Sequence, residues 1–158
     1  DQSNHGNDLY LYSGYDYNAE RTSYIQFDIS SIPASATVAS AELWIYVIDS
    51  WNTIDSNFIF AVREAADAWN EFTITWENAP LAATITTFIG PANGYTGWIK
   101  ISGSGLTATI QNWISYPLFN NGISIVPLWG LPSNDELTFE SKESFSSNTP
   151  KLFVRYTY

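Results

Sequence analysis

The chain contains no cysteine, no methionine and a single histidine, His5, among its 158 residues. The lack of cysteine excludes disulfides, zinc–thiolate sites and thiol nucleophiles. A serine–histidine–aspartate site would have to use His5, and no nucleophile-elbow pattern accompanies that residue, so we expect it to lie in a surface loop. Two carboxylates can hydrolyse glycosides, but among sixteen acidic residues a suitable pair arises by chance. We therefore predict that the protein is not an enzyme.

Positive charge is scarce as well. Sixteen acidic residues outnumber six basic ones and give a formal net charge of −10. The basic residues are scattered along the sequence: Arg21, Arg63, Lys100, Lys142, Lys151 and Arg155. This spacing predicts no basic stripe, which disfavours binding to nucleic acid or to anionic membranes. An acidic polysaccharide would be repelled at long range unless a cation bridged it, so we expect a neutral glycan or a calcium-mediated contact.

Long apolar runs are also absent, and none approaches the length of about 18 residues that crosses a membrane. The content of 45% hydrophobic and 16% aromatic residues nevertheless excludes disorder. The length fits one domain over residues 1–158, which can bury roughly 68–70% of its unfolded surface. Because the sequence begins at Asp1 without a signal peptide, we expect a removed leader or a larger parent protein. The low charge and the many polar and aromatic residues indicate a secreted or surface protein.

Alternation of apolar and polar residues predicts most of the fold. The clearest stretch, Thr22 to Val47, is expected to form two strands joined by turn formers, with Ile25, Phe27, Leu43 and Ile45 facing the core. Further short strands are predicted at 9–12, 58–63, 72–76, 84–89, 96–101, 123–128, 137–141 and 152–158. Apolar spacing predicts a short helix at 106–115 and a helical turn at 65–71. We predict an all-β fold, an antiparallel two-sheet β-sandwich of jelly-roll type with one or two short helices.

Five pieces of the sequence, taken in order, resemble one known family. They are YIQFDISSIPASATVASAELWIYV, AWNEFTITWENAP, GWIKISGSGLTATIQNWI, NNGISI and FESKESFSSNTPKLFVRY. In this order and spacing they resemble the DNRLRE-type β-sandwich domain, akin to the carbohydrate-binding modules beside alginate lyases and other extracellular polysaccharide-degrading enzymes. The resemblance covers residues 4–158. It implies a non-catalytic extracellular module that recognises a polysaccharide.

The start of the chain departs from this family. The family usually opens with an additional strand, whereas this sequence begins near the loop Asn4-His5-Gly6, and the Ser-Arg-Glu piece reads Ser141-Lys142-Glu143. A missing strand leaves an open sheet edge and an unfilled groove, which native proteins seldom leave uncovered. A strand from a neighbouring copy could fill it. The alternative function is therefore a self-assembling structural subunit of an extracellular filament, tubule or surface layer, with strand complementation between neighbouring copies.

The aromatic residues divide between predicted core positions and candidate contact positions. Four tryptophans inside predicted strands or helices are expected in the core: Trp69, Trp76, Trp98 and Trp113. The contact candidates lie in polar loops or on the polar side of a strand: Trp51, Trp129, Tyr15, Tyr17, Trp44 and Tyr46. Exposed aromatic rings can stack on sugar rings, but they are equally typical of subunit contacts. Both alternatives stay open at this point.

Four carboxylates near the opening loops are candidate ligands for a structural calcium ion. They are Asp8, Asp16, Glu20 and Asp28. Hard oxygen ligands suit Ca²⁺, although the spacing does not match an EF-hand loop. A solvated acidic loop is the alternative.

Overall fold

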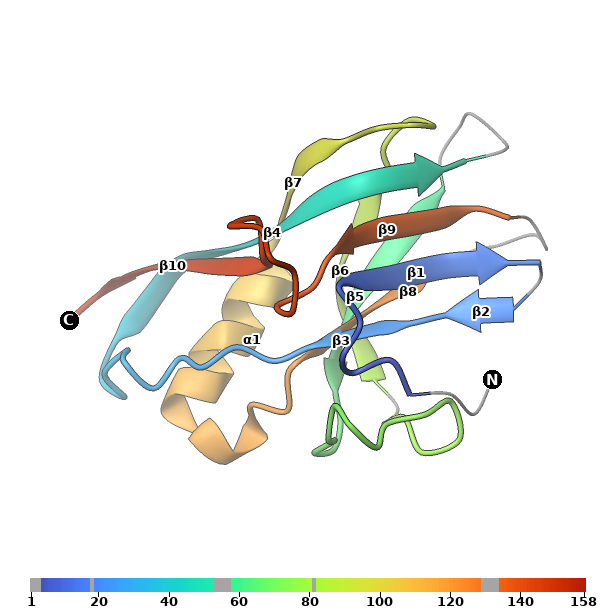
Figure 1. Cartoon of the computed structure of the whole chain (residues 1–158). Helices are drawn as coiled ribbons and strands as arrows, with labels where there is room; N and C mark the ends of the chain where they lie inside the picture. Colours follow the sequence, from blue (N-terminus) through green and yellow to red (C-terminus); the bar gives the residue numbers. More distant parts are fainter. Residues whose placement is uncertain (1–3, 18, 53–57, 81, 129–133) are drawn as a thin grey trace.

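The computed structural model describes residues 4–17, 19–52, 58–80, 82–128 and 134–158. These residues form two facing antiparallel sheets with a helix packed beside them (Figure 1). The elements are β1 (Tyr10–Asp16), β2 (Ala19–Arg21), β3 (Ser23–Ile25), β4 (Thr37–Trp51), β5 (Ile59–Ala65), β6 (Ala82–Ile89), β7 (Gly97–Ser102), α1 (Ser104–Ser115), a 3₁₀ turn (Pro117–Phe119), β8 (Ile123–Pro127), β9 (Glu136–Glu140) and β10 (Lys151–Thr157). The predicted all-β sandwich with a short helix is confirmed. No helix in the described part of the chain is long and apolar enough to cross a membrane.

The larger sheet has six strands and is organised by the long strand β4. Its order is β10-β4-β9-β1-β2, and β7 also pairs with β4. Residues 42–47 of β4 pair with β7 on one side. On the other side β4 pairs first with β10 and then, beyond a register shift, with β9. The smaller sheet has four strands in the order β3-β8-β5-β6.

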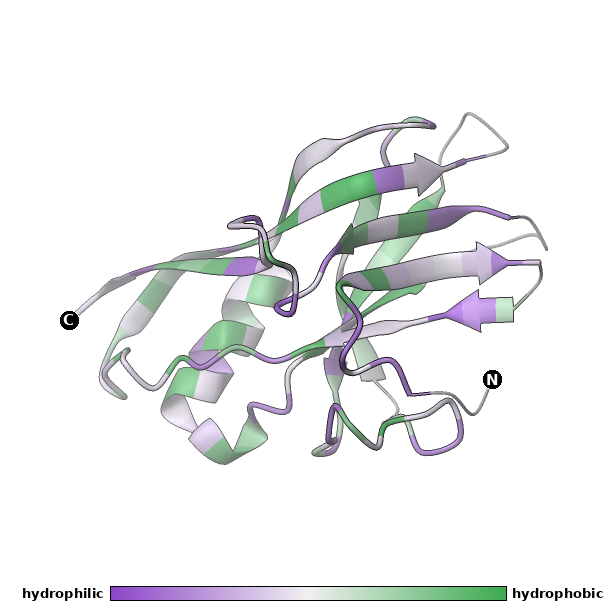
Figure 2. Ribbon diagram, in the orientation of Figure 1, coloured by the Kyte–Doolittle hydropathy of each residue, from purple (hydrophilic) through white to green (hydrophobic). Residues whose placement is uncertain are grey.

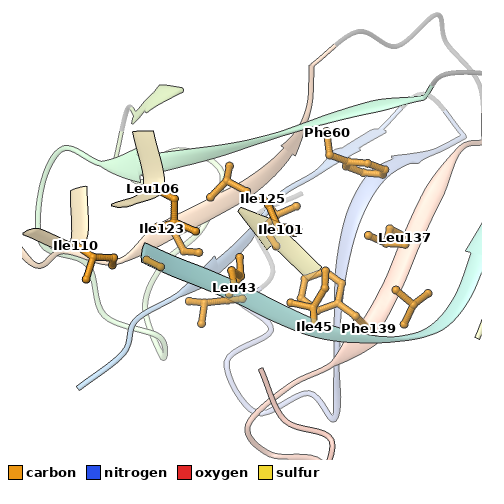
Figure 3. Close-up of a cluster of buried hydrophobic side chains, with 14 of the residues drawn as sticks. Leu43, Ile45, Phe60, Ile101, Leu106, Ile110, Ile123, Ile125, Leu137 and Phe139 are labelled. Atoms are coloured by element: carbon orange, nitrogen blue, oxygen red, sulfur yellow. The ribbon is translucent and has the colours of Figure 1, made fainter. Parts of the chain in front are cut away.

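The core lies between the two sheets and continues under α1. In β4, the buried residues Ala41, Leu43, Ile45 and Val47 alternate with residues that are partly exposed, as predicted. Figure 3 shows the two labelled β4 side chains among the other core residues: Phe60, Ile101, Leu106, Ile110, Ile123, Ile125, Leu137 and Phe139. Figure 2 shows the hydrophobic residues along the middle of β4 and the hydrophilic residues of β2.

Helix α1 confirms the helix predicted at 106–115 and packs directly on β6. A Cβ atom at Gly105 would stand 1.8 Å from the carbonyl oxygen of Ile85, so only glycine allows this approach. Trp113 is buried in the core, as predicted, and its Nε1 donates a hydrogen bond of 2.8 Å to Oε1 of Glu64. The helix therefore joins the sheets into one packed unit.

Two of the elements predicted from the sequence are not formed, and one predicted strand is shorter than expected. Residues 71–73 and 76–78 form two turns in place of the strand expected at 72–76, because the side chains of Asn70 and Asn78 bond to nearby backbone groups and compete with strand pairing. Residues 65–71 form no helical turn. The strand expected to reach Ile29 ends at Ile25 as β3, and residues 26–29 pair with no strand in the described part of the chain. β3 and β4 belong to different sheets, so Thr22 to Val47 crosses the sandwich.

Candidate functional site

The outer face of the larger sheet carries a continuous group of aromatic and basic side chains across three strands. Strand pairing places Trp44 of β4 opposite Lys100 of β7 on one side and opposite Lys151 of β10 on the other. Within all three strands, the residues two positions before or after these also have their side chains on the outer face of the sheet. We call this group the basic-aromatic face: Ser40, Glu42, Trp44, Tyr46, Trp98, Lys100, Ser102, Lys151, Phe153 and Arg155.

The aromatic rings of this face contact one another edge to face. The ring centroids of Trp44 and Trp98 are 6.3 Å apart, those of Trp44 and Phe153 are 5.9 Å apart, and those of Tyr46 and Trp98 are 5.3 Å apart. Edge-to-face pairs at these distances are attractive. Nε1 of Trp44 also donates a hydrogen bond of 3.0 Å to Oε2 of Glu42, which fixes the indole. The result is a preorganised aromatic surface whose rings are all at least partly open to solvent.

The same face has a local excess of positive charge. Nζ of Lys100 is 3.4 Å from Oε1 of Glu42, and Nζ of Lys151 lies 4.5 Å from the centroid of the Trp98 ring. Arg155 lines a shallow depression of about 450 Å³ beside Trp44. The hydrogen bond from Trp44 and the nearby Lys100 lower the pKa of Glu42, so this carboxylate is charged at neutral pH. Three basic groups therefore face one acidic group.

The scattered spacing of the basic residues in the sequence did not reveal that some of them meet on one face. Half of the six basic residues of the chain gather on this face, because β7 and β10 both pair with β4 although they lie far apart in the sequence. A flat aromatic surface of this kind can stack on the apolar side of sugar rings, and the surrounding polar groups can bond hydroxyls. Lysine and arginine side chains can additionally pair with carboxylate or sulfate groups.

The remaining aromatic candidates that the structure describes lie apart from this face. Trp51 ends β4 opposite Glu136 and is 58% exposed, and Tyr17 follows β1 and is 83% exposed. Tyr15 is half-buried against the core, and burial, together with the Glu20 carboxylate 3.4 Å from its hydroxyl, raises its pKa. Trp129 lies outside the described residues. Of the six candidates, the structure brings together Trp44 and Tyr46.

Trp98 belongs to the basic-aromatic face, so its predicted place in the core was wrong. It alternates with Ile99 and Ile101, which pack inward, and this alternation was a signal that the sequence carried. Trp76 is also not in the core, since it is 58% exposed. Trp69 is half-buried outside the core cluster, where its Nε1 donates a hydrogen bond of 2.7 Å to the carbonyl oxygen of Asn121.

The four predicted calcium ligands have separate partners. Asp8 accepts from the His5 ring at 2.7 Å, Glu20 accepts from the Tyr15 hydroxyl, and Asp16 pairs with Arg21. Asp28 accepts from the Ser30 amide at 2.9 Å, and hydrogen bonds from Ser30 lower its pKa. Within the described residues, no three side chains of the metal-binding types form a cluster. Calcium binding by these residues stays a prediction.

A groove of about 1640 Å³ lies on another side of the molecule. Its walls are formed by β1, by residues 22–34 and by the loop 69–79, and core residues Ile25, Trp113 and Ile114 reach it. A groove beside an open edge is the feature that the resemblance implies for a chain without the family's opening strand. The surface therefore offers two candidate sites, the basic-aromatic face and this groove.

Comparison with known proteins gives one family. No curated protein matches the chain. The family model of carbohydrate-binding module family 96 matches residues 1–156, which is nearly the whole chain. This match confirms the expected kind of module, whereas the DNRLRE-type name and an association with alginate lyases stay predictions. The chain belongs to carbohydrate-binding module family 96.

Proposed function

We propose that this chain is a non-catalytic module that binds a polysaccharide on the basic-aromatic face. The observation that carries the proposal is the register of β7, β4 and β10, which places Trp44 between Lys100 and Lys151 on an outward-facing, fixed aromatic surface. Rings that are already held in place lose little conformational entropy on binding. Membership of a carbohydrate-binding family supports a sugar as the ligand.

The local charge favours a polysaccharide that bears carboxylate or sulfate groups. The net charge of −10 repels such a polymer at long range. At physiological ionic strength, however, charges farther apart than about 8 Å are largely screened. Direct contacts with Lys151 and Arg155 then outweigh the distant acidic residues. This reasoning replaces the expectation of a neutral glycan or a calcium bridge, which rested on net charge alone.

The absence of catalysis and the extracellular location are part of the same proposal. The single histidine, His5, is exposed in the loop before β1 and bonds to Asp8, away from the basic-aromatic face. Modules of this kind bind sugars without cleaving them, and the family match is consistent with that role. The proposed extracellular location rests on the low content of charged residues and the high aromatic content of the chain.

The test is affinity electrophoresis in native gels that contain a neutral polysaccharide, a polyuronate or a sulfated polysaccharide. We expect retardation in the gels that contain an acidic polymer, without added calcium, and weaker retardation at high salt. Retardation in no gel would contradict the proposal. Retardation only with calcium would instead favour the bridging mechanism.

A matched pair of variants locates the site. Phe153 lies on the basic-aromatic face and is 54% exposed, whereas Phe72 borders the groove and is 56% exposed. We expect Phe153→Ala to reduce retardation and Phe72→Ala to leave it unchanged. The reverse result would place the polysaccharide in the groove and refute the proposed site.

A further inference from the structure

The groove is bordered by residues 26–29, which follow β3 and are not assigned to a strand. Nδ2 of Asn120 donates a hydrogen bond of 2.9 Å to the carbonyl oxygen of Phe27, so this carbonyl faces Asn120. Gln26 and Asp28 flank Phe27 and line the groove. We take their backbone groups to face the groove, on the side opposite to that of the Phe27 carbonyl. The amides of these two residues donate no hydrogen bond to any residue that the structure describes.

A second open edge lies across the groove in β1. Residues 10–13 of β1 pair with β9 on one side, whereas β2 pairs only with residues 14–16 on the other. The floor between the two edges includes the core residues Ile25 and Ile114. The Tyr12 carbonyl accepts a hydrogen bond of 2.7 Å from Oγ of Ser23, but no described strand pairs with residues 10–13 on this side. Two edges without a neighbouring strand, beside apolar lining residues, suit an extended polypeptide strand, which adds main-chain hydrogen bonds and buries alternate side chains.

The charge of the groove is opposite to that of the free edge strand β10. Six acidic and two basic side chains line the groove, which gives a net charge of −4 with His5 neutral: Asp8, Asp16, Glu20, Asp28, Glu71 and Glu143 against Arg21 and Lys142. β10 ends the larger sheet, since it pairs only with β4, and it carries Lys151 and Arg155. Each copy of the chain therefore has one acidic open edge and one basic open edge.

We propose that a second copy of this chain lays its β10 edge along the groove, with Lys151 and Arg155 facing the acidic rim. Opposite charges on adjacent strands stabilise the pairing and set its direction. Because the two surfaces are different, the contact is heterologous, and it joins successive copies into a ring or an open chain. This contact would produce the self-assembling subunit considered from the sequence. It does not depend on sugar binding, although it uses two residues of the basic-aromatic face.

Sedimentation velocity over a range of protein concentrations, at about 0.15 M salt, tests the proposal. We expect species that grow with concentration and that dissociate when the salt is raised to about 1 M. A protein that stays monomeric up to its solubility limit would overturn the proposal.

Two variants of Gln26 separate the strand edge from the side chain. Gln26→Pro removes the amide that faces the groove, and Gln26→Ala keeps it, whereas both lose the side-chain hydrogen bond to the carbonyl oxygen of Asn120. We expect the proline variant to associate about tenfold more weakly than the alanine variant, which is the loss of one well-made hydrogen bond. Equal association would refute pairing at this edge. Polysaccharide binding should be unchanged in both variants, so a failure here is distinct from a failure of the proposed function.

A charge exchange between the groove and β10 tests which strand is the partner. Recovery of association in a mixture of two variants would also show that both variants are folded. Asp28→Lys reduces the net charge of the groove from −4 to −2, and the double variant Lys151→Glu/Arg155→Glu reverses the charge of β10, so each alone should associate more weakly than the wild type. Mixing the two should restore part of the association, since the acidic β10 of one variant then meets the less acidic groove of the other, and the basic β10 meets the unchanged groove. Wild-type association of either variant alone, or no recovery in the mixture, would contradict the charge pairing.

Discussion

Replacing Trp44 with alanine removes the centre of the basic-aromatic face. Trp44 contacts Trp98 and Phe153 through two edge-to-face pairs, each worth about 0.5–1.5 kcal/mol. The substitution should therefore lower the free energy of unfolding by about 1–3 kcal/mol. Its neighbour Glu42 remains solvent-accessible after losing the indole partner, so it adds no penalty of an unpaired buried charge. The variant should fold and remain testable.

Trp44→Ala should weaken polysaccharide binding more than the replacement of other exposed aromatic residues by alanine. A tryptophan at the centre of a binding surface typically contributes about 2 kcal/mol or more, which corresponds to about a 30-fold loss of affinity. Titration calorimetry measures this loss of affinity, with the polysaccharide that retards the protein in the native gels. The temperature is one at which denaturant unfolding shows that the variant is folded. Trp44→Phe should lie between the wild type and Trp44→Ala, since it keeps a ring but loses the bond to Glu42.

Trp76→Ala is the control, because Trp76 is 58% exposed and lies beside the groove, away from the basic-aromatic face. It should bind with the affinity of the wild type. The reasoning would be refuted if folded Trp44→Ala also kept that affinity.

Three further substitutions test the packing and the electrostatics. Gly105→Ala should lower the free energy of unfolding in urea by about 2 kcal/mol, because its Cβ would overlap the Ile85 carbonyl and force α1 away from β6; unchanged stability would show that the helix shifts freely. Ser13→Ala should cost about 1–2 kcal/mol in the same assay, since the buried Ser13 hydroxyl donates a 2.8 Å hydrogen bond to the carbonyl oxygen of Ile125 between the sheets. Burial raises the pKa of Glu136 above 4.5, so its contribution to stability is full below pH 4.5 and is lost as the pH rises through the folded-state pKa. Glu136→Gln should therefore gain stability relative to the wild type as the pH rises from 4.5, and a gain in the opposite direction would contradict the assignment.

Much of the fold could be predicted from local patterns. The period-2 pattern of β4 and the apolar spacing of α1 were sufficient to predict both elements and their buried faces. The strand expected at 72–76 failed because two asparagine side chains bond to the local backbone there, which an apolar alternation does not reveal. The strand expected to reach Ile29 ended early because, among the described residues, β8 pairs with β3 only as far as Ile25. Which strands pair with one another is set by the tertiary structure and is not visible in a local sequence pattern.

The candidate site could be predicted only in part, because it depends on which strands pair with one another. Trp44 and Tyr46 share a strand, so their common outward face was visible in the sequence. Lys100 and Lys151 became their neighbours through pairing of strands that are distant along the chain, and no local pattern specifies that register. Net charge was a misleading guide, because it averages an acidic groove with a basic face.

The most direct test of the central claim uses the seven indole N–H signals of the tryptophans in a two-dimensional NMR spectrum. A short oligosaccharide of the retained acidic polysaccharide is titrated into labelled protein. Binding on the basic-aromatic face predicts shifts of the Trp44 and Trp98 signals, whereas the signal of the buried Trp113 stays in place. Shifts confined to Trp69 and Trp76, which line the groove, or no shift with any polysaccharide, would contradict the account.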